Sequence, residues 1–135
     1  MQSTARWEQG LRSVVDNGRG HSVTVDLPEA KNGTDQGPTA LELTFMGLSG
    51  CISTIFALIA ANSKVEFEAL TVNLEDTSPE NVKSISSVKA IVRVKSEESE
   101  RKLQKVLDKT KATCPVELLF EDAGVDIETT LVMED

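Results

Sequence analysis

Residues Thr39 to Asn62, TALELTFMGLSGCISTIFALIAAN, form the most apolar stretch of this chain and decide its fold. Large apolar side chains in helical spacing are those of Leu41, Phe45, Leu48, Ile52, Ile55, Phe56 and Ile59. These side chains recur every three or four residues, which is the period of an α-helix. No charged residue occurs between Leu43 and Ala61. A helix that is apolar on almost every face must be buried nearly all round. We therefore predict a long, buried central helix over residues 39–62.

The start of this helix carries its own signal. Pro38 is well suited to a helix start, and Thr39 can cap the first turn with its hydroxyl group. Glu42 follows three residues later and completes the Thr-x-x-Glu pattern of a capping box. We therefore expect the central helix to begin at this threonine.

The same stretch is long enough to cross a lipid bilayer, so a membrane span is the first alternative. Glycine, serine and threonine residues dilute its hydrophobicity, and Lys64 is the one cation close to its ends. An aromatic belt and an asymmetry of positive charge, which mark membrane spans, are both missing. The pattern favours the core helix of a soluble domain, with no membrane partner.

Composition limits the remaining possibilities. A chain of 135 residues has the size of one domain, so we predict a single domain over residues 1–135. The formal net charge is −8, and no basic cluster stands out, which argues against nucleic acid and anionic membranes as partners. The first ten residues lack the pattern of a signal peptide, so we expect a cytoplasmic protein.

Before the helix, the sequence predicts a β-hairpin. A short strand-like segment at residues 5–9 precedes it, and the hairpin covers Arg12–Leu27 with a turn at Asp16–Gly20, where Asn and Gly accept positive φ angles. Residues 28–37 are polar and rich in Gly and Asp, so we expect a loop there.

After the helix, apolar and polar residues alternate over 65–75, 84–95 and 125–133, which predicts three strands. A change of phase at Ala69–Leu70 suggests a bulge in the first of them. Between the last two strands, residues 96–112 have a narrow apolar stripe among charges and predict a second helix capped by Ser96. A short apolar turn follows up to Phe120. This order of elements predicts an α+β fold in which an antiparallel sheet packs on the central helix.

The central helix also predicts an oligomer. A helix of 24 residues is about 36 Å long, and the rest of a chain this short cannot easily cover it on every side. A second copy of the chain would cover it. We therefore expect an obligate homodimer in which the central helices pack together.

The two cysteines, Cys51 and Cys114, are the residues with reactive potential. Each can be a small apolar residue of the core, and burial statistics favour that interpretation for either cysteine alone. Two thiols can also form a peroxide-reducing couple, in which a thiolate is oxidised to a sulfenic acid and the second thiol resolves it. The attacking thiolate needs a nearby cation to lower its pKa. Arg12 and Arg19, which flank the hairpin turn, are the candidates, and each can equally be a solvated surface residue.

Two other residues complete the candidate set. Glu42, beyond its role in the capping box, could hold an arginine in a bidentate ion pair. His21, the only histidine, is interpreted as a surface residue. Two cysteines and one histidine are too few and too widely spaced for a zinc site, and no phosphate-binding loop or nucleophilic serine motif occurs. The sequence therefore predicts no metal and no cofactor.

Several motifs resemble one known family. Residues 37–43, GPTALEL, followed by residues 47–51, GLSGC, resemble the GPSPMEL…LxGC segment of the OsmC/Ohr family of osmotically induced and organic-hydroperoxide-resistance proteins. Residues 114–116, CPV, resemble the second cysteine motif of that family. Residues 20–23, GHSV, ahead of the loop NGTD at 32–35, also fit. The likeness spans nearly the whole chain in the same order.

The resemblance implies an intertwined α+β homodimer with two active sites built from both subunits. It implies that Cys51 is the peroxidatic cysteine and Cys114 the resolving one. It also implies an arginine from the hairpin, for which Arg12 is our first candidate and Arg19 the second, held by a glutamate near the start of the central helix. In the peroxidase branches an acid lies ten residues before the first cysteine. Here the residue ten before Cys51 is Leu41, and the acid, Glu42, lies nine before it, about 100° round the helix from Leu41.

From these observations we expect a thiol peroxidase that reduces organic hydroperoxides and is recycled by an external dithiol. An apolar pocket with Phe45 or Phe56 in its lining would favour alkyl peroxides. The alternative is a non-catalytic, stress-associated or small-molecule-binding protein with the same fold, in which both cysteines are structural.

Overall fold

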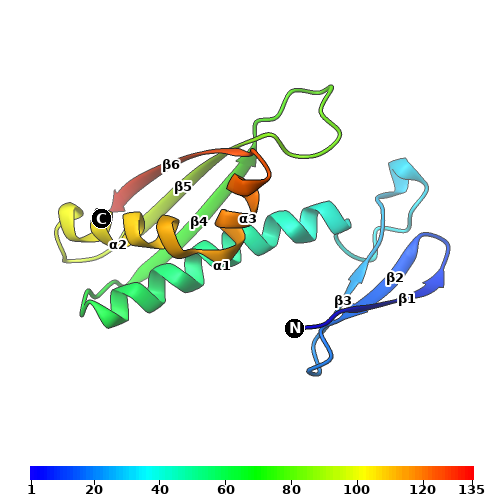
Figure 1. Cartoon of the computed structure of the whole chain (residues 1–135), viewed down its shortest axis with the longest axis horizontal. Helices are drawn as coiled ribbons and strands as arrows, with labels where there is room; N and C mark the ends of the chain where they lie inside the picture. Colours follow the sequence, from blue (N-terminus) through cyan, green and yellow to red (C-terminus); the bar gives the residue numbers. More distant parts are fainter. The chain divides into compact units, whose positions relative to one another are not determined.

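A computed structural model describes all residues of the chain, Met1–Asp135 (Figure 1). The residues group into two compact units, Met1–Met46 and Gly47–Asp135, and the division falls within the central helix. Each unit contains one three-stranded sheet. That the two units form a single domain stays a prediction.

The first unit contains the strands β1 (Thr4–Gln9), β2 (Arg12–Asp16) and β3 (Ser22–Val25). They form an antiparallel sheet in this order, with β2 in the centre. Gly10 and Gly18 have positive φ angles in the two turns, a conformation that glycine adopts without steric cost. The predicted hairpin over residues 12–27 is confirmed.

The loop from residue 28 to residue 37 is organised by one buried carboxylate. Asp26 accepts hydrogen bonds from the backbone N–H groups of Leu27, Thr34 and Gln36 and from the Thr34 hydroxyl group. The Thr34 bond comes first among the causes that lower the pKa of Asp26. The predicted loop is confirmed, although it contains the short 3-10 helix η1 (Glu29–Lys31).

The central helix α1 covers Ala40–Asn62, and its start is the predicted one. The Glu42 N–H donates to the Thr39 hydroxyl oxygen at 3.0 Å, and the Thr39 N–H donates to the Glu42 carboxylate at 3.0 Å. These two hydrogen bonds are the reciprocal pair of a capping box.

The prediction that α1 is buried on nearly every face is wrong for the single chain. Its fully buried residues are Leu48, Ile52, Phe56 and Ala60, which are spaced by four and lie along one side of the helix. Leu41 and Leu58 are 44% and 53% exposed. One chain therefore covers one stripe of the helix and leaves other apolar side chains in contact with solvent.

The second unit holds the strands β4 (Ala69–Asp76), β5 (Ser87–Lys95) and β6 (Asp126–Glu134) and the helices α2 (Glu100–Thr113) and α3 (Pro115–Asp122). Figure 1 shows the three strands side by side, with β5 in the centre. The strand pair β4–β5 is antiparallel and the pair β5–β6 is parallel. The predicted antiparallel pairing is therefore confirmed for β4–β5 and wrong for β5–β6, because α2 and α3 form a crossover that returns the chain in the same direction.

The side chains on one face of β5 are buried in the hydrophobic core. Val88, Ala90, Val92 and Val94 are buried on this face, as their alternation predicts. On α1, the Phe56 ring meets the Phe67 ring edge to face, with 5.8 Å between ring centroids. The buried side chains of α1, β5 and α2 together form the hydrophobic core of the second unit.

Three local predictions need correction. Strand β4 starts at Ala69 and pairs in regular register, so the change of phase marks the beginning of the strand and no bulge. Helix α2 starts at Glu100, with Ser99 as its cap. Ser96 instead donates to the Glu66 carbonyl oxygen and accepts from the Glu98 N–H. The expected apolar turn after Cys114 is the helix α3.

Candidate functional site

Two cysteine side chains meet in the second unit. The Sγ atoms of Cys51 and Cys114 lie 2.8 Å apart, and both cysteines are free thiols. Cys51 lies in α1, beside the buried residue Ile52, and is partly exposed. Cys114 is completely buried. The fold thus brings together two thiols that are separated by 63 residues in the sequence.

Cys114 occupies the junction between two helices. Its N–H donates to the Thr110 carbonyl oxygen and ends α2, and its own carbonyl oxygen accepts from the Leu118 N–H in α3. Pro115 holds the first position of α3, where the missing N–H of proline has no cost. The backbone of Cys114 is therefore held by hydrogen bonds on both sides.

The environment keeps the proton on Cys114. Burial and the hydrogen bond to Cys51 raise the pKa of the Cys114 thiol to about 12. The N–H groups of Glu117 and Val116 lower this pKa by a smaller amount, although neither makes a capping hydrogen bond to the sulfur. Cys114 is therefore a hydrogen-bond donor to Cys51 in the reduced protein.

Glu117, which follows Cys114 by three residues, is a buried acid that the sequence analysis did not single out. Glu117 in α3 is fully buried, and neither of its carboxyl oxygens has a hydrogen-bond partner. Burial raises the pKa of Glu117, Lys111 lowers it and Glu121 raises it. One signal could have revealed it: a single acid stands within the apolar run Val116–Phe120.

Arg12 lies in β2 of the first unit. Its Nε is 3.0 Å from a carboxylate oxygen of Glu8, without the direction that a hydrogen bond requires. Arg19 is exposed in the turn before β3, where its backbone N–H donates to the Asn17 side chain. His21 is also exposed and lies 3.0 Å from the same asparagine.

Glu42 has its role in the capping box, and Arg12 has its ion pair with Glu8. The two predicted partners are thus engaged with other residues in this chain. Their roles, and that of Arg19, stay predictions. The structure brings the two cysteines together and leaves the charged residues with local partners.

The predicted pocket lining is only partly available. Phe56 is fully buried in the core and cannot line an open pocket, whereas Phe45 is half-buried. No group of three or more His, Cys, Asp and Glu side chains is arranged to hold a metal ion.

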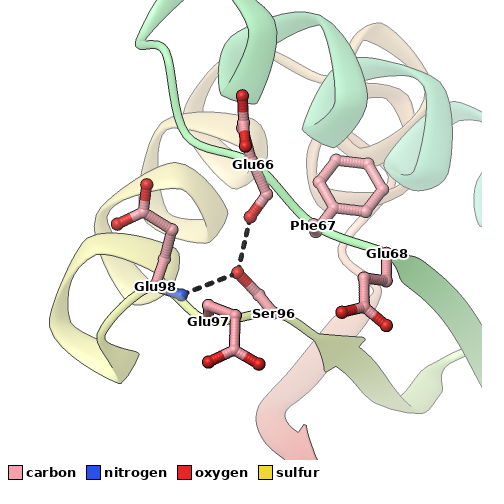
Figure 2. A pocket seen from close by; sticks show the side chains of 6 residues that line it. All are labelled: Glu66, Phe67, Glu68, Ser96, Glu97 and Glu98. Atoms are coloured by element: carbon pink, nitrogen blue, oxygen red, sulfur yellow. Dashed lines mark hydrogen bonds between the residues drawn. The ribbon is translucent and has the colours of Figure 1, made fainter.

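A separate hollow of about 370 Å³ is shown in Figure 2. It is lined by Glu66, Phe67, Glu68, Ser96, Glu97 and Glu98. Two of its carboxylates are already paired, Glu68 with Lys95 at 2.8 Å and Glu98 with Lys102 at 2.7 Å. None of the predicted site residues takes part in it.

Comparison with known proteins identifies the fold. The chain is similar to solved structures of an OsmC-like protein from Mycoplasma pneumoniae (16% identity, covering 99% of this chain and 96% of that one, TM-score 0.84) and of an organic hydroperoxide resistance protein OsmC from Legionella pneumophila (15%, 98% and 97%, TM-score 0.72). A third, an organic hydroperoxide resistance protein from Elizabethkingia anophelis, has 18% identity, covers 98% and 94%, and has a TM-score of 0.68.

Among curated proteins, none matches the sequence. The family model described as "OsmC-like protein" matches residues 33–130, which is most of the chain. Helix α1 is apolar and long enough to cross a membrane, but in this family it is the core helix of a soluble protein. The resemblance seen in the cysteine motifs is therefore confirmed, and the chain belongs to the OsmC-like family.

Proposed function

We propose that this protein is a cytoplasmic, cysteine-based thiol peroxidase that reduces organic hydroperoxides. The observation that carries the proposal is the 2.8 Å separation of the Cys51 and Cys114 sulfurs. A disulfide bond has a length of about 2.05 Å, so a small movement of either side chain would allow the bond to form. Some structurally similar proteins are organic hydroperoxide resistance proteins by name, which agrees with this chemistry.

The different burial of the two thiols supports a peroxidatic role for Cys51 and a resolving role for Cys114. Cys114 keeps its proton over the physiological pH range, since its pKa is raised to about 12. Cys51 is the more accessible sulfur, so it is the one that meets the hydroperoxide. Its thiolate attacks the terminal oxygen of ROOH, the O–O bond breaks, and the products are a sulfenic acid on Cys51 and RO⁻, which takes a proton from water to give ROH.

The second step closes the cycle on the protein side. The Cys114 sulfur attacks the sulfenic sulfur, the S–O bond breaks, and the thiol proton leaves with the hydroxyl group as water. The product is the Cys51–Cys114 disulfide. An external dithiol then reduces this disulfide and returns both thiols.

The charged residues would support the first step. A guanidinium group near Cys51 favours the thiolate, and Arg12 is the candidate for that role, with Glu42 as the carboxylate that orients it. We propose that this arrangement forms in a homodimer. The apolar side chains of α1 that a single chain leaves exposed, Leu58 among them, support a second copy as their cover.

Titration with cumene hydroperoxide tests the proposal. One equivalent should remove both free thiols of the wild-type protein. Cys51→Ser should abolish the reaction, and Cys114→Ser should stop at a sulfenic acid that mass spectrometry detects after trapping with dimedone. Thiols that survive excess hydroperoxide would contradict the proposal.

A second candidate function is a non-catalytic binding role with structural cysteines. One observation favours it: both Glu42 and Arg12 are engaged with residues other than each other. In that case the thiols would not react with hydroperoxide, and replacement of either cysteine by alanine would change only the stability of the fold.

A further inference from the structure

Four lysines of this acidic chain line one small hollow in the second unit. They are Lys64, just after the end of α1, and Lys102, Lys105 and Lys109, which follow one another at spacings of three and four along α2. The hollow has a volume of about 180 Å³, and its other lining residues are a serine and two valines, so no acid lines it. A chain with a net charge of −8 thus concentrates positive charge at one place.

Most of this positive charge has no acidic partner. Lys102 pairs with Glu98 at 2.7 Å, but the ammonium groups of the other three lysines make no ion pair and no hydrogen bond. The acid next to this row, Asp108, instead accepts a hydrogen bond from the Gln104 side chain. Like charges three or four residues apart on a helix repel each other and destabilise it. An anion bound between the lysines would remove that repulsion.

The backbone of Lys64 has a conformation that suits glycine. Its φ angle is 55°, in the left-handed region that most side chains avoid. The Lys64 N–H donates to the Ala61 carbonyl oxygen. The Val65 N–H donates to the Ala60 carbonyl oxygen, which completes a Schellman motif at the end of α1. Glycine is usual at the position of Lys64 in this motif. A lysine there brings a fourth ammonium group to the hollow although the backbone is strained.

The size and the chemistry of the hollow suit a small anion with more than one negative charge. It is smaller than the pockets of about 300–1,000 Å³ that hold drug-sized molecules. Ammonium groups bind phosphate oxygens as point charges, and the hydroxyl group of Ser63, which also lines the hollow, can donate a hydrogen bond. An extended polyanion such as nucleic acid would need a much larger basic surface.

We infer that the four lysines bind a multiply charged phosphate group in this hollow, either as an inorganic anion or as part of a small organic phosphate. The site uses neither cysteine, so the inference does not depend on the proposed peroxidase cycle. It concerns residues of the second unit alone.

Calorimetric titration of the full-length protein tests the inference at physiological ionic strength, about 0.15 M. The probes are inorganic pyrophosphate and phenyl phosphate, and at least one of them should show saturable binding. Tighter binding of pyrophosphate would support an inorganic anion, and tighter binding of phenyl phosphate an organic phosphate. Lys105→Gln/Lys109→Gln should raise the Kd at least tenfold, since loss of one hydrogen bond to a charged group alone costs about that factor.

Lys83→Gln/Lys89→Gln is the matched control, because it removes two exposed lysines outside the hollow and changes the net charge by the same amount. It should keep the wild-type Kd. Lys64→Gly should raise the Kd about tenfold and also raise the melting temperature of the ligand-free protein, because glycine adopts this φ angle without strain. Absence of saturable binding of both probes to the wild-type protein would overturn the inference. An equal loss of affinity in the two double variants would also overturn it, because the overall charge would then account for binding.

Discussion

The two halves of the proposed site differ in how complete they are within one chain. The thiols of Cys51 and Cys114 both lie in the unit Gly47–Asp135 and already contact each other. The charged residues Arg12 and Glu42 lie in the unit Met1–Met46, and each is held by a neighbour. The proposed disulfide chemistry therefore uses residues of the second unit alone, whereas the proposed activation of the thiolate uses residues of the first unit.

The largest effect is expected from breaking the proposed dimer. Leu58→Asp places a charge on an apolar face of α1 that is 53% exposed in the single chain. A desolvated, unpaired charge is costly enough to prevent association. We expect the mass in solution to fall from a dimer to a monomer of 14.6 kDa, with a loss of peroxidase rate of more than about 100-fold.

Sedimentation and cumene hydroperoxide turnover measure this result. Oxidation by diamide should persist in Leu58→Asp, because the two cysteines belong to the same unit. Glu68→Gln, at an exposed position, serves as a control for surface mutation. A wild-type protein that is monomeric and fully active would contradict the dimer.

The next effect concerns the arginine. Arg12→Met should slow oxidation of Cys51 by hydroperoxide about 100-fold, because a preorganised charge at the reacting group is lost. The comparison variant is Arg19→Met in the exposed turn, which should retain the wild-type rate. Stopped-flow loss of free thiols at fixed hydroperoxide provides the rates. The opposite ranking of the two variants would assign the role to Arg19.

Glu42 combines two roles that can be separated. Glu42→Gln keeps an acceptor for the Thr39 N–H but removes the charge, so the helix start should persist. If the carboxylate orients the arginine, the oxidation rate should fall roughly tenfold, since a hydrogen bond to a charged group contributes roughly 1.5–3 kcal/mol.

Thr39→Ala is the reciprocal variant. It removes the hydroxyl group that accepts from the Glu42 N–H and should lower the free energy of unfolding by about 1 kcal/mol with little change in rate. Urea denaturation and hydroperoxide kinetics on both variants distinguish capping from catalysis. A Glu42→Gln protein with an unchanged rate limits that residue to the helix start.

The smallest effect is on stability and concerns Glu117. Glu117→Met removes two buried oxygens without partners and should raise the free energy of unfolding by about 1–3 kcal/mol near neutral pH. The pKa of Glu117 is raised in the folded state, so the folded protein binds more protons than the unfolded one. The stability of the wild-type protein should therefore decrease as pH rises above the ordinary carboxyl pKa of 4.5.

Glu117→Met should lack this component of the pH dependence. The difference between the two proteins isolates it from Asp16, Asp26 and Glu98, whose lowered pKa values act in the opposite direction. Denaturation curves from pH 4 to pH 8, a range of about four units around the carboxyl region, measure the difference. A stability difference that does not vary with pH would show that Glu117 is ionised in the folded state.

Local patterns predicted the elements whose signals are local. The capping box at Thr39 and Glu42 fixes the start of α1, and the alternation of β5 fixes its buried face. Ser96 and Ser99 are both able to cap a helix, and only the tertiary contact of Ser96 with Glu66 decides between them. Strand direction in the β5–β6 pair depends on the crossover, which the pattern of alternation does not specify.

The residues of the site also differ in whether the sequence alone could predict their positions. The proximity of Cys51 and Cys114 came from a resemblance to a family, since spacing alone cannot bring residues 63 positions apart together. The sequence analysis counted Glu117 as part of a short apolar turn and did not predict its burial. That burial depends on the packing of α3, which no local pattern shows.

The position of Cys114 as the shared end of two helices has a mechanical consequence. A disulfide bond between Cys114 and Cys51 would link the junction of α2 and α3 covalently to α1. Oxidation would then restrict the relative motion of these three helices. Amide hydrogen exchange around residues 110–118 should be slower in the disulfide form than in the dithiol form. The redox state of the two cysteine sulfurs would then control how rigid the junction of α2 and α3 is.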